Sequence, residues 1–281
     1  MNSTFNVDEL VQEIEEQGYT IIPDAITSDQ VNDAIVAMDE VFERERPIAE
    51  RFGEQTDNQK VVRNVLGKHP FFETFFNNLP VVTLCRRLLG DDMVLHDTTA
   101  RSILPSAGRE DLHGFQVHVD RETFTVNPFK DAAHIPIAIN VLWAFVDFTA
   151  ENGATMLWPG THRSLEVPDP SGDYPDYLQA EMPAGSVVMW DAATWHATGL
   201  NKSVGARHSA VAFYQRGWVK GDINNERVLP PEVRSRLGPD MRRLLGLDRR
   251  MPGYSSVRRL SSDQIDALSP EEKKVIGIGI Y

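Results

Sequence analysis

Apolar residues recur at helical spacing near both ends of the chain and gather in short runs between them. In the first stretch Leu10, Val11 and Ile14 fall on one side of a helix. Three N-terminal stretches are predicted to be helical on this pattern: residues 7–18, 27–46 and 70–90. The polar, charged stretch 47–59 between the last two is predicted to be a loop. We therefore predict a helical N-terminal region over residues 1–92.

The middle of the chain, residues 93–218, has a different pattern. Its apolar residues form short β-rich segments separated by turn residues: MVLHDTTARSIL, FQVHV, HIPIAINVLWAFVDF, TMLW, SVVMWDA and HSAVAFYQRGW. Several strands at this spacing, with no helical pattern between them, favour an antiparallel sandwich or barrel. Residues 219–281 return to helical and loop propensities, with RSRLGPDMRRLLGL as the clearest helix. We predict a single domain over residues 1–281 with a β-core at about 93–218, and 219–281 is a candidate lid or homodimer contact.

Composition limits the partners more than it defines the fold. The chain has 281 residues, with 28 Lys and Arg against 41 Asp and Glu and a formal net charge of −13. A net negative field repels phosphate backbones, which argues against nucleic acid. The sequence has no secretory signal pattern and no apolar run near the roughly 18 residues of a membrane helix. We expect a cytoplasmic protein without membrane association, and the single Cys85 excludes an internal disulfide and a cysteine metal cage.

Three residues form a candidate metal site. His118 and Asp120 are two positions apart in FQVHVD, so on an extended chain their side chains point to the same face. His196 follows the β-rich run SVVMWDA. Two histidines and one carboxylate leave three adjacent positions of an octahedral metal open, which is the usual ligand choice for non-haem Fe(II) in oxygenases. The same residue types also bind zinc in hydrolases, so a zinc site is an alternative.

Further residues extend this candidate site. Arg207 begins the β-rich run that follows His196, where a guanidinium can pair with the distal carboxylate of a dicarboxylic acid. Thr155 lies in the turn-rich segment ENGATMLWPGTHR and could present its hydroxyl inward. His162 in the same segment is interpreted as structural. Four other residues are candidates to line a substrate pocket: Arg101, Phe115, Trp143 and Trp195.

At these positions the sequence resembles the phytanoyl-CoA dioxygenase-type Fe(II)/2-oxoglutarate oxygenases. The resemblance runs from GYTIIPDAITSDQV through HVD, DFTAENGATMLWPGTHRS and WHATGLNKSVGAR to Tyr214, about three quarters of the chain. It implies a double-stranded β-helix (jelly-roll, cupin-like) core with N-terminal and C-terminal helices. It also implies Fe(II), 2-oxoglutarate and O2 as cofactor and co-substrates, with succinate and CO2 as products.

The resemblance assigns a role to individual residues. It implies that the iron is held by His118, Asp120 and His196. It implies that Arg207 anchors 2-oxoglutarate and that Thr155 and Gln116 donate hydrogen bonds to it. Halogenases that resemble this family replace the ligand aspartate by alanine or glycine, so the presence of Asp120 argues against halogenation.

The reaction and the substrate stay open at this point. Hydroxylation, desaturation, epoxidation and rearrangement are all compatible with the implied site. The acidic balance argues mildly against a coenzyme A thioester, so we favour a small organic substrate such as a specialised metabolite. The alternatives are an acyl-CoA hydroxylase of phytanoyl-CoA type, a zinc-dependent hydrolase and a non-catalytic jelly-roll binding protein.

Overall fold

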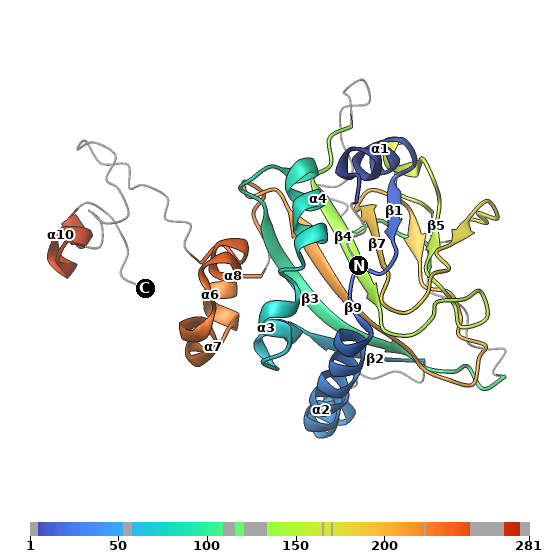
Figure 1. The fold of residues 1–281 in the computed structure, drawn as a ribbon, viewed down its shortest axis with the longest axis horizontal. Coiled ribbons are helices and arrows are strands. Elements are labelled where there is room, and N and C mark those ends of the chain that lie inside the picture. Colours follow the sequence, from blue (N-terminus) through green and yellow to red (C-terminus); the bar gives the residue numbers. More distant parts are fainter. Residues whose placement is uncertain are drawn as a thin grey trace.

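The described residues form two antiparallel β-sheets, with helices packed against the larger sheet (Figure 1). The computed structural model describes residues 5–52, 58–108, 116–120, 134–164, 166–169, 171–221, 223–247 and 267–275. Its α-helices are α1 (Val7–Gln17), α2 (Ser28–Phe52), α3 (Phe72–Phe75), α4 (Leu79–Leu89), α6 (Asn225–Val228), α7 (Pro231–Arg236), α8 (Pro239–Leu244) and α10 (Pro270–Val275). Its strands are β1 (Tyr19–Ile22), β2 (Gln59–Arg63), β3 (Val94–Ile103), β4 (Ala138–Ala144), β5 (Met156–Leu157), β6 (Leu178–Gln179), β7 (Val187–Asp191), β8 (His196–Ala197) and β9 (Arg207–Gln215), and two 3₁₀ turns are η1 (Val65–Gly67) and η2 (Thr161–Arg163).

The larger sheet has six strands in the order β1-β7-β4-β9-β3-β2, and the smaller has three in the order β6-β5-β8. All neighbouring strands in both sheets are antiparallel, so the predicted antiparallel β-core with flanking helices is confirmed. Two strands of the larger sheet come from outside the predicted core range 93–218. They are β1 and β2, and β2 begins at Gln59, the last residue of the predicted loop.

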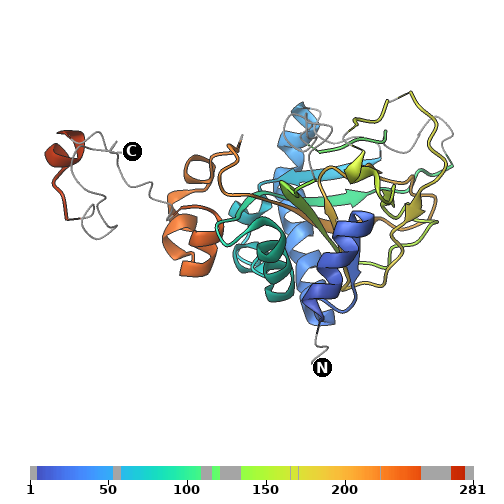
Figure 2. The same ribbon diagram turned by 90° about the horizontal axis from the view of Figure 1, so that it is seen from above.

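The two faces of the larger sheet have different roles. Along β4, Ile139, Val141 and Trp143 alternate with Asn140 and Leu142, as the twofold period of a strand requires. The first three residues belong to the core that the sheet forms with the helices, and the other two line a cavity on the opposite face. Figure 2 shows α1 and α4 on one side of this sheet. The helices therefore seal one face and leave the other for a site.

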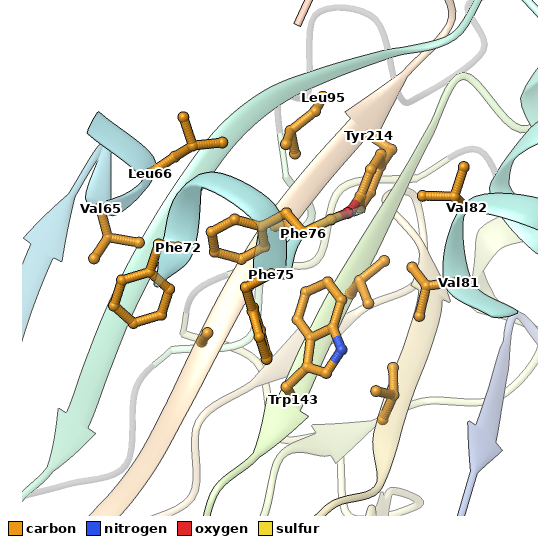
Figure 3. Packing of buried hydrophobic residues seen from close by; sticks show 14 of the residues in the cluster. Val65, Leu66, Phe72, Phe75, Phe76, Val81, Val82, Leu95, Trp143 and Tyr214 are labelled. Carbon is orange, nitrogen blue, oxygen red and sulfur yellow. The ribbon is translucent and has the colours of Figure 1, made fainter. Parts of the chain in front are cut away.

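Aromatic side chains dominate the helix-covered face. Trp143 contacts both Phe75 and Phe76 of the α3 region, with ring centroids 5.4 and 5.5 Å away (Figure 3). Tyr214 from β9 is fully buried beside them and donates a hydrogen bond to the carbonyl of Phe76 at 2.6 Å. Side chains of this size contribute the largest apolar areas of a core. They fix α3 and α4 on the sheet.

Three helical predictions differ from the structure at proline and polar breaks. α2 continues through Pro47, where we expected a loop, because losing one backbone hydrogen bond does not end a helix whose earlier turns are buried. The stretch 70–90 is two helices, since Asn78 caps a new helix by accepting a hydrogen bond from the Val81 amide at 3.3 Å. RSRLGPDMRRLLGL divides into α7 and α8 at Gly238 and Pro239.

Two of the described C-terminal helices, α7 and α8, pack on the helix-covered side of the sheet. Val233 from α7 and Met241 from α8 are buried in the same core as α3 and α4. Arg236 pairs with the buried Glu73 of α3, with Nε 2.8 Å from Oε2. Residues 223–247 therefore support the sheet from the face opposite the cavity. Among the described helices, none is long and apolar enough to cross a membrane.

Candidate active site

The structure brings together the three predicted metal ligands. His118 and His196 form an antiparallel bridge in which each backbone amide donates to the other residue's carbonyl at 3.0 Å. Asp120 lies two residues beyond His118, and its carboxylate oxygens are 3.8 Å from Nε2 of His118 and 3.3 Å from Nε2 of His196. One ligand atom from each residue lies within 4.8 Å of the others. Backbone hydrogen bonds thus join two segments that are distant in the sequence.

Hydrogen bonds orient both imidazoles. Nδ1 of His118 donates to the Gln116 carbonyl at 2.9 Å, and Nδ1 of His196 donates to the Thr194 carbonyl at 2.9 Å. Because a carbonyl only accepts, each ring carries a proton on Nδ1 and turns Nε2 towards Asp120. This is the arrangement in which outer hydrogen bonds fix the tautomer of a metal-binding histidine.

The protonation states also suit a divalent cation. Burial alone would raise the pKa of Asp120, but His196, His118 and a 2.7 Å hydrogen bond from Nδ2 of Asn140 hold that pKa well below its usual range. Burial lowers the pKa of His118, and the neighbouring His196 lowers it further. Both shifts favour the forms that bind metal, an ionised carboxylate at Asp120 and a neutral imidazole at His118.

The three ligands open onto a cavity of about 360 Å³ on the face of the larger sheet that the helices leave free. Its floor is formed by side chains of β2, β3, β4, β7 and β9. Thr155 is buried and lines this cavity, and so does Arg101. A cavity of this size lies within the range of small-molecule sites.

Arg207 is a buried cation without an anion among the described residues. It is 2% exposed, and its Nε and Nη1 have no hydrogen-bond partner. Its guanidinium lies over the ring of Phe148 at 4.4 Å from the centroid. Burial, and secondarily the positive charge of Arg101, lowers the pKa of Arg207 to about 9. A buried charge is expensive unless it is paired, so this residue is suited to a carboxylate from a bound molecule.

Two other predicted site residues lie at or beyond the edge of the described structure. Gln116 is exposed and does not line the cavity, and its backbone carbonyl serves the site by holding Nδ1 of His118. Phe115 lies outside the described residues.

Two of the predicted pocket residues are placed elsewhere, and these expectations need correction. Trp143 occupies the odd-numbered face of β4 and packs into the aromatic core, because neighbouring strand residues alternate between faces. Trp195 precedes the ligand His196 and points away from the cavity for the same reason. Its Nε1 donates to the Glu166 carbonyl at 2.8 Å, and its ring contacts Tyr174 at 4.9 Å.

The structure adds cavity residues that the sequence analysis missed. Asn140 supports the ligand Asp120 from β4, and it is the one polar residue in the buried strand AINVLWA. A lone amide in an apolar strand is a usable signal, because buried polar groups need a partner. Trp190 contacts His196 at 5.1 Å between ring centroids, and Asp97 lines the cavity from β3. Whether these side chains face the cavity depends on strand register, which the sequence pattern does not specify.

Hydrogen bonds join the end of α1 to the PGTH segment and to the turn that precedes His196. Nε2 of His162 donates to the Glu15 carbonyl at the end of α1 at 3.1 Å, which agrees with its structural interpretation. Gly18 follows α1, and its carbonyl accepts hydrogen bonds from the Asp191 amide and the Thr194 hydroxyl, both at 2.9 Å. The end of α1 is therefore hydrogen-bonded to the segment that carries the predicted metal ligand His196.

The donor set and the unpaired arginine fit an iron ion with a bidentate dicarboxylic acid. Two imidazoles and one carboxylate would hold the ion and leave positions for a co-substrate, and Arg207 would supply a buried cation for a second carboxylate. An antiparallel β-core with this site defines the class of non-haem iron oxygenases.

Comparison with known proteins gives the family. The family model for phytanoyl-CoA dioxygenase (PhyH) matches residues 14–209, and the chain belongs to this family. It is an Fe(II)- and 2-oxoglutarate-dependent dioxygenase that uses O2. Dioxygenase af480 of Aspergillus fumigatus is 25% identical over 254 residues, which cover 87% of this chain and 78% of that protein.

Solved structures share the jelly-roll fold at low sequence identity. The 2-oxoglutarate-dependent carbocyclase SnoK from nogalamycin biosynthesis has a TM-score of 0.58 and 21% identity, covering 74% of this chain and 83% of its own. EctD from S. alaskensis, solved with 2-oxoglutarate and 5-hydroxyectoine, has a TM-score of 0.62 and 17% identity, covering 77% and 79%. The fold predicted from the family resemblance is confirmed.

Proposed function

We propose that this dioxygenase oxidises a small organic molecule, a specialised metabolite, and that hydroxylation is the reaction, with succinate and CO2 released. The similarity to SnoK, an enzyme of nogalamycin biosynthesis, supports a substrate of this kind. Desaturation, epoxidation and rearrangement are the alternative outcomes at the same site. An acyl-CoA substrate is the alternative within the family.

The proposal rests on Arg207, a buried cation that has no anionic partner among the described residues. It lies in the same β-core as His118, Asp120 and His196. In this proposal His118, Asp120 and His196 hold the iron, and Arg207 neutralises the distal carboxylate of 2-oxoglutarate. Thr155, buried at the cavity wall, donates a hydrogen bond to the same molecule. Gln116 stays a predicted donor.

The chain contributes orientation and exclusion of water. Bound iron with 2-oxoglutarate and O2 supplies the oxidising equivalents. The imidazoles are held by carbonyl acceptors and the carboxylate by Asn140, so the ligands need little rearrangement on loading. The cavity wall then determines which carbon of the substrate lies nearest the metal, and positioning of this kind selects the bond that reacts.

Anaerobic titration of the Fe(II)-loaded protein with 2-oxoglutarate tests the proposal. We expect a weak visible metal-to-ligand charge-transfer band, followed by Fe(II)-dependent succinate formation when O2 is admitted. His118→Ala should lose both signals. His69→Ala is the matched control, because His69 hydrogen-bonds Glu40 outside the cavity and should leave both signals unchanged. Succinate formation that persisted without Fe(II) would refute the proposal, and hydrolysis with Zn(II) alone would favour the hydrolase.

A substrate panel separates the alternatives within the family. It should include phytanoyl-CoA beside free terpenoids, alkaloids and polyketide-derived compounds. We expect substrate-dependent succinate formation with a free compound and none with the thioester. Turnover of the thioester in preference to the free compounds would overturn the proposed substrate class.

A further inference from the structure

A β-bulge turns an acidic side chain into the cavity. In the β3–β9 ladder Leu95 is paired with Tyr214 and Asp97 with Phe213, so His96 is the extra residue of a bulge. Leu95 faces the helix-covered core, and in a regular strand Asp97 would face the same core. With the bulge, Asp97 lines the cavity instead. Bulges beside active sites commonly re-aim a side chain in this way.

The Asp97 carboxylate has no partner in the described protein. Its Oδ1 is shielded from solvent and accepts no hydrogen bond, and no described arginine, lysine or histidine forms an ion pair with it. Arg101, four residues further on the same face, is engaged elsewhere. Its Nε donates to Gln59 at 3.1 Å and its Nη1 to Thr198 at 3.4 Å. A shielded carboxylate oxygen without a donor is costly, which points to a donor supplied by a ligand.

Asp97 lies at one end of a row that crosses the sheet on the cavity face. The register places Phe213 next to it, then Asn140, and then Trp190. Asn140 donates to the metal ligand Asp120. Since neighbouring strands are about 4.8 Å apart, Asp97 and Asn140 are separated by roughly 10 Å of sheet. A molecule held at Asp97 can therefore reach the metal site only if its body spans this distance.

Apolar side chains lie between Asp97 and Asn140 on the cavity face. Phe213 lies in the row itself, and Leu142 and Val211 form the next row along the same face. At the far end the indole Nε1 of Trp190 is buried and has no hydrogen-bond partner among the described residues. Arg63 also lines the cavity, but it is exposed and is paired in register with Thr99. Phe213, Val211 and Leu142 thus form an apolar strip on the cavity floor, and Asp97 offers an acceptor at the end of the row away from the metal ligands.

We propose that Asp97 determines substrate specificity by binding a hydrogen-bond-donating group, an ammonium or a hydroxyl, of a substrate with a largely apolar body. The inference rests on the proposed function, since it takes this cavity to be the substrate site. It places the group that Asp97 binds about 10 Å from the position that is oxidised.

Paired ring compounds test this inference on the anaerobic Fe(II)·2-oxoglutarate complex. The probes are 3-hydroxysteroids with their 3-deoxy partners and tricyclic amines with their carbon analogues, and retention on the protein is measured by mass spectrometry. We expect the donor-bearing member of a pair to bind at least 10-fold more tightly to the wild-type protein, as a hydrogen bond to a charged group predicts.

Two substitutions of Asp97 distinguish the two donor groups. Asp97→Leu should remove the preference for both alcohols and amines. Asp97→Asn keeps an acceptor without the charge, so it should weaken amine binding by about 10- to 100-fold and alcohol binding less. Thr99→Val, on the same face of β3, is the matched control and should keep the preference. Equal binding within the pairs, binding of no probe, or an unchanged preference in Asp97→Leu would overturn the inference.

The charge-transfer band separates this test from that of the proposed function. Both Asp97 variants should give the wild-type band with Fe(II) and 2-oxoglutarate, which also shows that they are folded. A normal band without donor preference contradicts only the role of Asp97. Loss of the band in the wild-type protein contradicts the proposed function itself.

Discussion

Arg207 is a guanidinium that folding removes from water without giving it an anion in the described protein. A residue in this state destabilises the free protein and gains its partner only on binding. The polar groups with the clearest ligand-binding signal are thus those that the fold leaves unpaired: Arg207, the Asp97 carboxylate and the Trp190 indole.

Replacing Arg207 by Met should separate binding from stability. Arg207→Met leaves the distal carboxylate of 2-oxoglutarate without a cation, which costs roughly 3–5 kcal/mol, or two to three or more decades of affinity. The same change removes an unpaired buried charge, so the metal-free protein should be as stable as wild type or more stable by about 1–3 kcal/mol. Anaerobic titration and urea unfolding measure the two effects. An unchanged affinity for 2-oxoglutarate would show that Arg207 has another role.

The lowered pKa of His208 predicts how the free energy of unfolding changes with pH. Burial lowers its pKa below 6.5, and its Nδ1 is 2.6 Å from the Ser102 hydroxyl on the core side of β9. Between pH 6.5 and the lower folded-state pKa, the unfolded chain binds the proton more readily, so stability falls as the pH falls through this range. His208→Gln should reduce this slope by up to about 1.4 kcal/mol per pH unit. Urea unfolding between pH 5 and 7 measures it, and an unchanged slope would contradict the assignment.

At the scale of elements, the junction of α1 and β1 supports the ligand segment. Gly18 has a φ of +90°, and a Cβ there would lie 2.5 Å from Oγ1 of Thr194 and 2.6 Å from Nδ1 of His162. Only glycine satisfies both the backbone conformation and the close approach. The helix end and the turn before His196 therefore form one packed unit.

Gly18→Ala should affect both folding and metal binding. Gly160→Ala is the matched control, because Gly160 has a φ of +80° but no atom of the described residues lies within 4 Å of an added Cβ. Both substitutions should cost about 1–3 kcal/mol of unfolding free energy from backbone strain, and Gly18→Ala should cost more because of the contacts. Only Gly18→Ala should weaken Co(II) binding, followed by its visible spectrum. Equal losses of metal affinity in the two variants would argue against the link between α1 and the site.

The pattern of the sequence predicts elements better than it predicts which face a residue occupies. The apolar runs identify β3, β4, β7 and β9, and the HxD spacing places His118 and Asp120 on one side of the chain. Trp143 and Trp195 were expected in the pocket because they lie in β-rich segments, but the face depends on register. The bulge at His96 is a tertiary feature that a run of β-formers does not reveal.

The predicted helix boundaries are wrong where one local signal opposes a longer apolar pattern. Pro47 predicts the end of a helix, yet α2 continues because its buried face is already packed on the core. Gly238 and Pro239 divide a stretch whose charge and apolar pattern suggest a single helix. Within the site, Asn140 could have been recognised from its apolar surroundings, whereas Asp97 could not.

For the whole molecule, the two faces of the larger sheet separate stability from chemistry. The helix-covered face carries the main apolar core, and the cavity face carries the three ligand candidates together with Asp97 and Trp190, whose Oδ1 and Nε1 atoms lack partners among the described residues. The excess of negative charge lies mainly in residues 1–60, which hold fifteen Asp and Glu against four Lys and Arg. The cavity itself contains both signs of charge, so the mean charge of the chain does not describe its site.

Ligand binding should stabilise the whole molecule through this site. A ligand at 100 times its dissociation constant adds about 2.7 kcal/mol to the free energy of unfolding. Under anaerobic conditions Mn(II) with 2-oxoglutarate should raise the Tm of the wild-type protein. It should not raise the Tm of His118→Ala, and in Arg207→Met only the increment from 2-oxoglutarate should be lost. A rise of equal size in His118→Ala would place metal binding elsewhere.

The reciprocal backbone bond between His118 and His196 means that the ligands are assembled by the chain, before any ion arrives. Small zinc domains obtain their structure from the metal and unfold when it is withdrawn. Here the core on the other face of the sheet does not depend on the ion. A chelator should accordingly yield an intact, empty protein that can be refilled with iron or exchanged for a spectroscopic metal.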